Sequence, residues 1–153
     1  MKKYQLILLF LFINFAALAI GSWLMNNGPR TEWYQNLNQA PWTPPGWFFG
    51  VAWTTIMICF SIYMASLVKL DSSKWVWLLF AIQFILNVSW NYIFFNQHLV
   101  GFGLVSILVL TFIVGVFIVK YKPILKAKTW LIAPYFIWLI IASTLNAYIY
   151  FNN

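Results

Sequence analysis

Acidic residues are almost absent from this sequence, and their scarcity counts against several classes of function. Only two are present, Glu32 and Asp71, and both lie outside the long apolar segments. Ion-coupled transporters and proton pumps usually carry ionisable side chains inside the membrane, and hydrolytic enzymes use such groups as general acid and base. The usual residues of both classes are missing here. Nucleotide-driven transport has no support either, because no glycine-rich phosphate loop is present.

Cysteine and histidine are equally scarce, with Cys59 and His98 as the single examples. One cysteine cannot form an internal disulfide, and inside an apolar segment it is most simply a small apolar filler. A lone loop histidine is more often solvated than a ligand, and no cluster shows metal-ligand spacing. The sequence therefore predicts no metal site and no required cofactor.

Charged residues of either sign make up only 7% of the 153 residues, whereas hydrophobic residues make up 63%. A soluble domain averages about 25% charged residues, so a chain this apolar needs an exterior that faces lipid. A helix needs about 20 apolar residues to span the hydrocarbon core. Five segments meet that length: residues 4–25, 46–68, 75–96, 100–121 and 129–150.

These segments predict helices rather than the strands of a membrane barrel. Barrel strands alternate apolar and polar residues over about ten positions, and these segments do not. Helices satisfy their own backbone hydrogen bonds, as lipid requires. We therefore predict an all-α membrane protein, a five-transmembrane-helix bundle that forms a single transmembrane domain over residues 1–153. The first segment has an alternative, a signal peptide cleaved near Ala17-Leu18-Ala19, although its apolar run continues to Met25.

Basic residues predict the orientation of the bundle. With five spans, eight of the nine lie on the side of the N-terminus, and only Arg30 lies on the other. The positive-inside rule then places the N-terminus in the cytoplasm and the C-terminus outside a multi-pass protein, expected in a bacterial cell membrane. The net charge of +7 thus requires no nucleic acid, and attraction to anionic membrane lipid is a secondary effect.

Neutral polar side chains fall on one face of the third predicted span. Gln83, Asn87, Trp90 and Asn91 are spaced i, i+4, i+7 and i+8, which places them on one side of a helix. An unpaired amide in lipid costs several kcal/mol, so this face must turn inward. The amides could simply hydrogen-bond neighbouring helices. Alternatively, they line a cavity.

Two other predicted spans carry matching groups. Trp138, Ala142 and Asn146 share one face of the fifth span, and the second span carries Trp53. With a rise of about 1.5 Å per residue, these groups lie in the outer half of the bundle, at depths similar to the amides of the third span, and Trp138 lies nearer the midplane. Aromatic faces with a few polar contacts suit a flat apolar ligand.

Residues 26–45 form a connection that is too long for a simple helix link. It contains Tyr34 and Trp42, with three prolines around the latter. Proline fixes φ and stiffens the backbone. We therefore predict an ordered, outward-facing lid over the cavity mouth, with Tyr34 and Trp42 in contact with the ligand. A loop that only caps the bundle is the alternative.

Taken together, these residues resemble a known family, that of the tryptophan-rich sensory protein and translocator protein (TspO/MBR). The similarity rests on the first loop, the third span and the fifth span. In the loop it comprises Trp33-Tyr34, Leu37 and Pro41-Trp42-Thr43-Pro44-Pro45. In the spans it comprises Gln83, Asn87, Trp90, Phe94, Phe95, Pro134-Tyr135, Trp138, Ala142, Leu145-Asn146 and Asn152.

The resemblance implies a five-helix bundle that binds porphyrins and related tetrapyrroles and that forms a homodimer. Some members are reported to degrade protoporphyrin in light and oxygen through pocket tryptophans, which by position would be Trp53 and Trp138. The sequence departs from the family at Asn91, where a small hydroxyl residue is expected, and no basic residue follows Tyr148, so cholesterol binding there is doubtful. By position the pocket would be lined by Trp42, Asn87, Trp90 and Ala142.

These observations favour a membrane receptor or sensor for porphyrins and other flat apolar ligands. The sequence leaves three alternatives open. The protein could be a light- and oxygen-dependent porphyrin-degrading enzyme, which would need no acid-base pair. It could be a passive transporter of tetrapyrroles, because no coupling residue is present. It could also have a purely structural or regulatory role.

Overall fold

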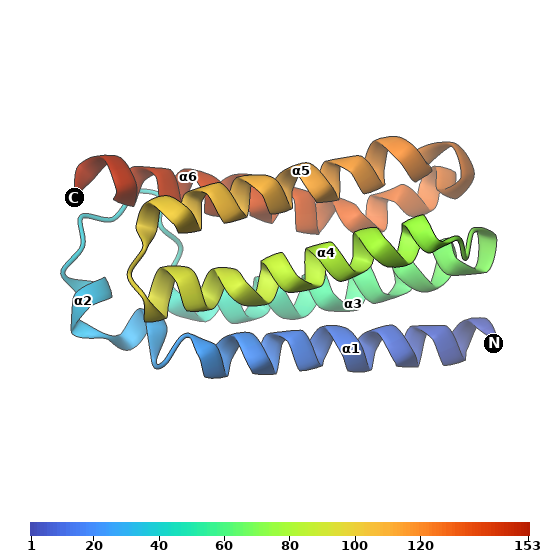
Figure 1. Cartoon of the computed structure of the whole chain (residues 1–153), viewed down its shortest axis with the longest axis horizontal. Coiled ribbons are helices and arrows are strands. Elements are labelled where there is room, and N and C mark those ends of the chain that lie inside the picture. The colour runs from blue at the N-terminus through green and yellow to red at the C-terminus, as the bar shows by residue number, and fades with distance from the viewer.

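The computed structural model describes all 153 residues, and each of its elements is helical (Figure 1). Five long helices lie side by side, and the two chain ends lie at opposite ends of the bundle. The long helices are α1 (Lys3–Leu24), α3 (Gly46–Leu70), α4 (Lys74–Asn91), α5 (Val100–Leu125) and α6 (Ala133–Asn152). The short elements are η1 (Gly28–Arg30), α2 (Glu32–Gln35), the π-helical segment η2 (Tyr92–Asn96) and the 3-10 segment η3 (Lys126–Ile132).

Four continuous helical stretches are long and apolar enough to cross a membrane. The fourth has 53 residues and contains both α5 and α6, which reverse direction through η3 and pack against each other. Large apolar side chains on the outside of the bundle are well exposed, as at Phe12 (75%) and Phe112 (69%). The predicted all-α class is therefore confirmed, and the exposed apolar surface is of the kind that lipid solvates.

Two predictions about the last helices need correction. The fifth predicted span, residues 129–150, contains Pro134, and a proline inside a helix would kink it; Pro134 instead lies in the first turn of α6, where its missing N–H leaves no hydrogen bond unmade. α6 itself begins at Ala133 rather than residue 129, because η3 continues as a 3-10 segment to Ile132. α5 in turn extends beyond the predicted end at 121, through Pro123, to Leu125.

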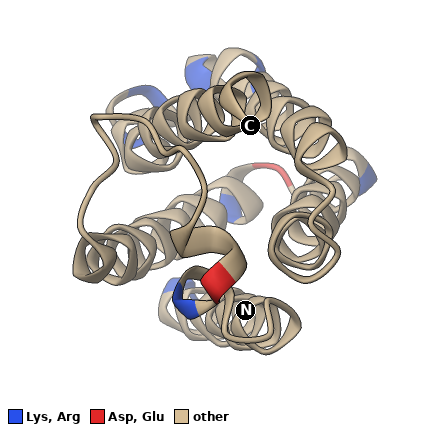
Figure 2. Ribbon diagram, turned by 90° about the vertical axis from the view of Figure 1, so that its left-hand side faces the viewer, with Lys and Arg blue, Asp and Glu red and all other residues tan.

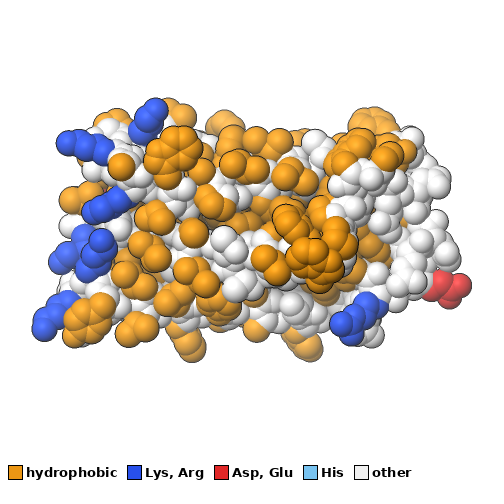
Figure 3. All heavy atoms as spheres, turned by 180° about the vertical axis from the view of Figure 1, so that it is seen from behind, with side chains coloured by type: hydrophobic (Ala, Val, Ile, Leu, Met, Phe, Trp, Pro, Cys, Tyr) orange, Lys and Arg blue, Asp and Glu red, His pale blue; other side chains and the backbone are white.

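Basic side chains gather at the end of the bundle where the chain begins, and the middle of the surface is largely apolar (Figure 3). We call this end, which comprises the N-terminus, the α3–α4 connection and η3, the lysine-rich end. The opposite end comprises residues 26–45, the α4–α5 connection and the C-terminus, and we call it the lid end. Figure 2 views the bundle from the lid end and shows residues 26–45 crossing over it.

The lysine-rich half has a tightly packed aromatic core. Phe60, Tyr63 and Phe117 are fully buried, and the Phe60 ring lies 6.1 Å from each of the other two. The ring of Tyr135 packs edge-on against Phe60 at 5.1 Å. Edge-to-face arrangements at such distances are favourable for aromatic pairs. This core fixes α3, α5 and α6 relative to one another near the lysine-rich end. From there the three helices continue to the lid end.

The lid is fastened at several places, of which two link it to the α4–α5 connection and to the C-terminus. At one, the indole of Trp33 stacks on the imidazole of His98, with ring centroids 3.9 Å apart and an interplanar angle of 7°. At the other, Asn38 and Asn153 exchange hydrogen bonds: the Asn38 backbone N–H donates to Asn153 Oδ1 (2.9 Å), and Asn153 Nδ2 donates to the Asn38 carbonyl (3.1 Å). Residues 26–45 therefore form an ordered strap between the α4–α5 connection and the C-terminus.

Candidate ligand-binding site

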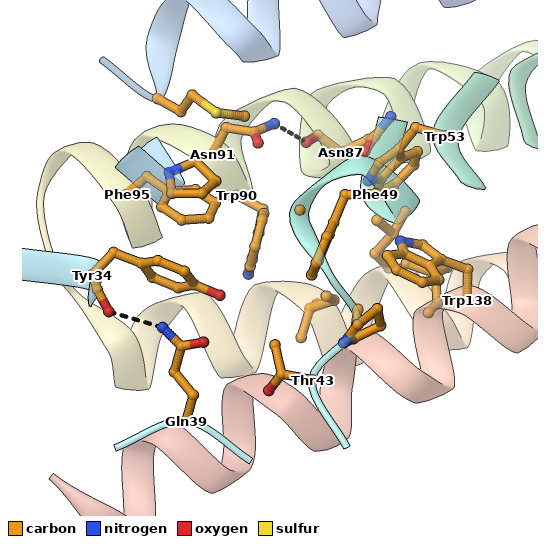
Figure 4. A pocket seen from close by; sticks show the side chains of 18 of the residues that line it. Tyr34, Gln39, Thr43, Phe49, Trp53, Asn87, Trp90, Asn91, Phe95 and Trp138 are labelled. Carbon is orange, nitrogen blue, oxygen red and sulfur yellow. Dashed lines mark hydrogen bonds between the residues drawn. The ribbon is translucent and has the colours of Figure 1, made fainter. Parts of the chain in front are cut away.

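A cavity of about 360 Å³ lies beneath the lid, between α3, α4, α5 and α6 (Figure 4). Its volume falls within the range of about 300–1,000 Å³ that is usual for small-molecule sites. The lid contributes several of its walls, including Tyr34, Gln39 and Thr43. Of the ten residues predicted to bind a ligand, the structure brings seven to the cavity wall: Tyr34, Trp53, Asn87, Trp90, Asn91, Trp138 and Ala142.

Two tryptophans from different helices form the deep wall. Trp53 comes from α3 and Trp138 from α6, and Trp138 is only 4% exposed. Phe49 meets the Trp138 ring edge-on at 5.3 Å, and Trp53 packs against Tyr135 at 6.1 Å. Two other indole N–H groups donate hydrogen bonds within the protein, those of Trp42 and Trp90, whereas those of Trp53 and Trp138 donate none. Both deep tryptophans can therefore present a ring and an N–H to a ligand.

Trp90 is held in place by a residue that was predicted to be in the cavity. Its Nε1–H donates to Asn146 Oδ1 at 3.0 Å, and Asn146 Nδ2 donates to the Val100 carbonyl at 3.0 Å. Asn146 is 2% exposed and does not line the cavity. Its amide instead joins α4, α5 and α6. Of the two alternatives for the amides, hydrogen bonding between helices or lining a cavity, Asn146 follows the first. The Trp90 ring also stacks on Phe94 at 5.0 Å.

Gln83 and Trp42 are also outside the cavity. Gln83 lies one turn too deep, where its Oε1 accepts a hydrogen bond from the Tyr135 hydroxyl at 2.8 Å. Trp42 is 54% exposed because its indole lies along the outer side of α6. There it donates to Thr144 Oγ1 at 3.1 Å and meets Tyr148 edge-on. The expectation that these two side chains line the pocket is not met, since both have partners elsewhere.

The two asparagines on α4 differ in their hydrogen bonding. Asn91 Nδ2 donates to the Asn87 carbonyl at 3.1 Å, and the side chain rests against Gly21 of α1, where an added Cβ would lie only 2.6 Å from that nitrogen. The Asn87 side chain is 8% exposed, lines the cavity and has no hydrogen bond within the protein. The Asn87 amide can therefore exchange hydrogen bonds with water or a ligand inside the cavity.

The lid side of the cavity carries polar groups that the sequence did not single out. Gln39 Nε2 donates to the Tyr34 carbonyl at 3.0 Å, which positions both residues over the cavity (Figure 4). The Tyr34 ring packs against Phe95 at 5.3 Å. Burial raises the pKa of Tyr34 above its ordinary value, so its hydroxyl remains neutral and able to donate. Thr43 could have been found from the loop motif, whereas Gln39 carried no distinguishing signal.

Phe49 is a further residue that sequence reasoning missed, although its spacing offered a clue. It lies four residues before Trp53, so both occupy the same face of α3. The wall that α5 contributes, through Ile107 and Leu110, could not have been recognised, because that helix is apolar on nearly every side. A uniformly apolar helix gives no periodic signal for which side turns inward.

The lining of the cavity defines what chemistry it can perform. No Lys, Arg, Asp, Glu or His side chain reaches it, and no three His, Cys, Asp or Glu side chains come together anywhere in the structure. The cavity can stack flat rings between aromatic faces and can exchange hydrogen bonds with a few neutral groups. It has no side chain that could act as a general base at neutral pH.

Comparison with known proteins places this arrangement in a family. The sequence model of the TspO/MBR family matches residues 9–151. A tryptophan-rich protein TspO of Archaeoglobus fulgidus is 34% identical, with 100% of this chain and 97% of that protein covered. A tryptophan-rich sensory protein of Cereibacter sphaeroides is 30% identical (75% and 73% covered), and the human translocator protein is 27% identical (83% and 78% covered). This chain therefore belongs to the TspO/MBR family of membrane proteins.

Proposed function

We propose that the protein is a membrane receptor that binds porphyrins and related tetrapyrroles in the cavity beneath the lid. The observation that carries this proposal is the combination of aromatic walls from three helices with the unpaired amide of Asn87. A porphyrin is a flat aromatic macrocycle that needs stacking faces. Its ring nitrogens or substituents can form hydrogen bonds with an amide that has no protein partner.

Arg30 supplies the charge that a porphyrin would need. The propionate groups of such a ligand are anionic, and the cavity itself holds no cation. Arg30 follows Pro29, which lines the cavity, and it is exposed at the lid end. No carboxylate lies within ion-pair distance of Arg30, so its guanidinium is available to a propionate. A ligand would thus bury its ring and keep its acidic groups near water.

The relatives support a sensory role in a general way. The protein from Cereibacter sphaeroides is named as a tryptophan-rich sensory protein and the human one as a translocator protein. The uncharged cavity suits binding better than active transport, because no ionisable group is positioned to couple ligand movement to an ion gradient. A receptor that reports ligand occupancy requires only the cavity and a lid that responds to it.

In the membrane, we propose that each of the five long helices forms one span. The support is that α5 and α6 run in opposite directions, each over more than 18 residues. The lysine-rich end would face the cytoplasm of a bacterial cell and the lid end the outside, as the positive-inside rule requires. We expect homodimers, and lipid around the remaining surface. A cysteine placed at Asn36 should react with an impermeant maleimide added outside intact cells.

The proposal is tested by titrating the purified protein with protoporphyrin in the dark. We expect quenching of tryptophan fluorescence at micromolar ligand and about tenfold weaker binding for Trp53→Phe or Trp138→Phe, a loss on the scale of one aromatic contact. Trp130→Phe is the matched control, because Trp130 is 79% exposed at the lysine-rich end. Absence of quenching in the unaltered protein would refute the proposal.

Illumination of the same samples separates binding from degradation. A receptor should leave the porphyrin absorbance no less stable than in buffer. Faster bleaching in the presence of the protein, lost in the Trp53→Phe/Trp138→Phe double variant, would instead support the light-dependent enzyme.

A further inference from the structure

A second hollow lies on the membrane-facing side of the same two helices that form the deep wall of the cavity. It is a groove of about 270 Å³ between α3 and α6. Val51 and Thr55 of α3 and Ile137 of α6 are among its lining, and Val51 and Ile137 are 54% and 57% exposed. Their exposure on the apolar middle of the bundle means that the groove opens toward lipid rather than toward water.

Trp138 is the only residue that lines both the groove and the cavity. Its indole therefore separates the cavity from the bilayer. Its ring meets Phe48 at 5.8 Å on the groove side and Phe49 at 5.3 Å on the cavity side, and it packs within the buried core. Its N–H makes no hydrogen bond within the protein. A side chain without a directional bond can change rotamer by giving up only packing contacts.

The lid is the other route into the cavity. Opening it would break the reciprocal hydrogen bonds between Asn38 and Asn153, the bond from Trp42 to Thr144, and the stack of Trp33 on His98. These contacts are distributed along the lid, from Trp33 to Trp42. The passage past Trp138 requires its indole, and the Phe48 ring beside it, to move, and neither side chain has a hydrogen bond to break.

We propose that the α3–α6 groove is a lateral portal, through which flat apolar ligands dissolved in the bilayer reach the cavity, with Trp138 as its gate. This inference rests on the proposed function and specifies it further: the ligands are those that partition into the membrane, not those delivered through water. Phe48 contacts the gate but does not line the cavity, so it governs the rate of passage rather than the strength of binding.

The portal is tested by closing each route separately and measuring the association rate of protoporphyrin in nanodiscs. In a Cys59→Ala background, Thr55→Cys with Ile137→Cys is joined by a bismaleimide across the groove, and Asn38→Cys with Asn153→Cys is joined across the lid. Mass spectrometry confirms each link. We expect the groove link to slow association by about tenfold or more, within the span over which association rates vary among variants of one site. The lid link should change it by less than about twofold.

Each result decides between the two routes. Slowing by the lid link alone, equal slowing by both links, or no slowing by either would overturn the portal while leaving the binding function intact. Failure of the unlinked protein to bind protoporphyrin at equilibrium would remove the proposed function and the portal with it.

A substitution at Phe48 gives a second, independent readout. Phe48→Ala should raise the association and dissociation rates together, each by about threefold, the scale of one aromatic contact, with the Kd unchanged. Ile58→Ala is the control, since Ile58 is 43% exposed on the same helix and lines neither hollow. A change in Kd without a change in both rates would contradict a gating role for Phe48.

Discussion

The two halves of the bundle use the same kinds of side chain for opposite purposes. In the lysine-rich half, the rings of Phe60, Tyr63 and Phe117 are fully buried and contact one another. In the lid half, Trp53 and Trp138 touch other aromatic rings but leave part of their surface on a cavity of about 360 Å³. Aromatic content alone therefore does not distinguish a core from a binding site.

The two halves also differ in where their unpaired polar groups lie. In the lysine-rich half, the Tyr63 hydroxyl donates to the Phe117 carbonyl and Asn14 donates to Ser61. In the lid half, the Asn87 amide and the indole N–H groups of Trp53 and Trp138 have no partner within the protein. The side-chain atoms that are sealed from solvent without a partner are the hydroxyls of Tyr121 and Thr129, both in the lysine-rich half. The unpaired groups of the lid half differ because they border a cavity, where a ligand can reach them.

The largest effect is expected from breaking the packed half. Phe60→Ala removes a ring with 0% exposure that contacts four other rings, and should lower the free energy of unfolding by about 3–5 kcal/mol. Thermal or denaturant unfolding in detergent micelles measures this. Phe112→Ala, at a 69% exposed position, should change stability by less than about 0.5 kcal/mol. Similar losses for both variants would mean that the two positions do not differ in packing.

An intermediate effect is expected at the junction between the halves. Asn146→Leu keeps the side-chain volume but leaves the Trp90 indole N–H unpaired, and should cost about 1 kcal/mol of stability. It should also weaken protoporphyrin binding, because Trp90 would lose its fixed orientation. Asn152→Leu serves as the control, since the side chain of Asn152 bonds only to the Tyr148 carbonyl on its own helix. Unfolding and ligand titration together check both effects, and an unaltered affinity would show that Asn146 does not position Trp90.

The smallest effect is expected at the lid. His98→Asn removes the ring that stacks on Trp33, while asparagine tolerates the positive φ of 57° at that position. The loss of one exposed stacking contact should increase amide hydrogen exchange in residues 31–37 by about twofold. Exchange around Phe60 should stay the same. Gln97→Ala, next in the chain, should leave the exchange of the lid unchanged, and equal increases in both variants would contradict the role of the stack.

Much of this architecture follows from the sequence, because lipid imposes strong rules on length and polarity. The first three predicted spans begin and end within two residues of α1, α3 and the α4–η2 segment. The regular spacing of Asn87, Trp90 and Asn91 places them together on the wall of the cavity. A spacing of three or four residues on a helix fixes a shared face without any knowledge of the partners.

The sequence could not decide which polar groups face the cavity and which join helices. Asn87 and Asn146 look alike in their spans, yet Asn146 is used between α4, α5 and α6 and Asn87 is not. That choice depends on which backbone carbonyl and which indole come within 3 Å, and so on tertiary packing. Trp42 was misplaced for a similar reason: a proline-rich loop fixes its own stiffness but not the side on which its indole docks.

The most direct test of the central claim, that the hollow in the lid half is a ligand site, is to fill it. Ala142 lines the cavity, and Ala142→Phe would place a ring where the ligand is expected. Calorimetric titration with protoporphyrin should then show micromolar binding to the unaltered protein and to an Ile58→Phe control, and none to Ala142→Phe, whose melting temperature should be maintained. Equal affinity in Ala142→Phe and the unaltered protein would contradict the account.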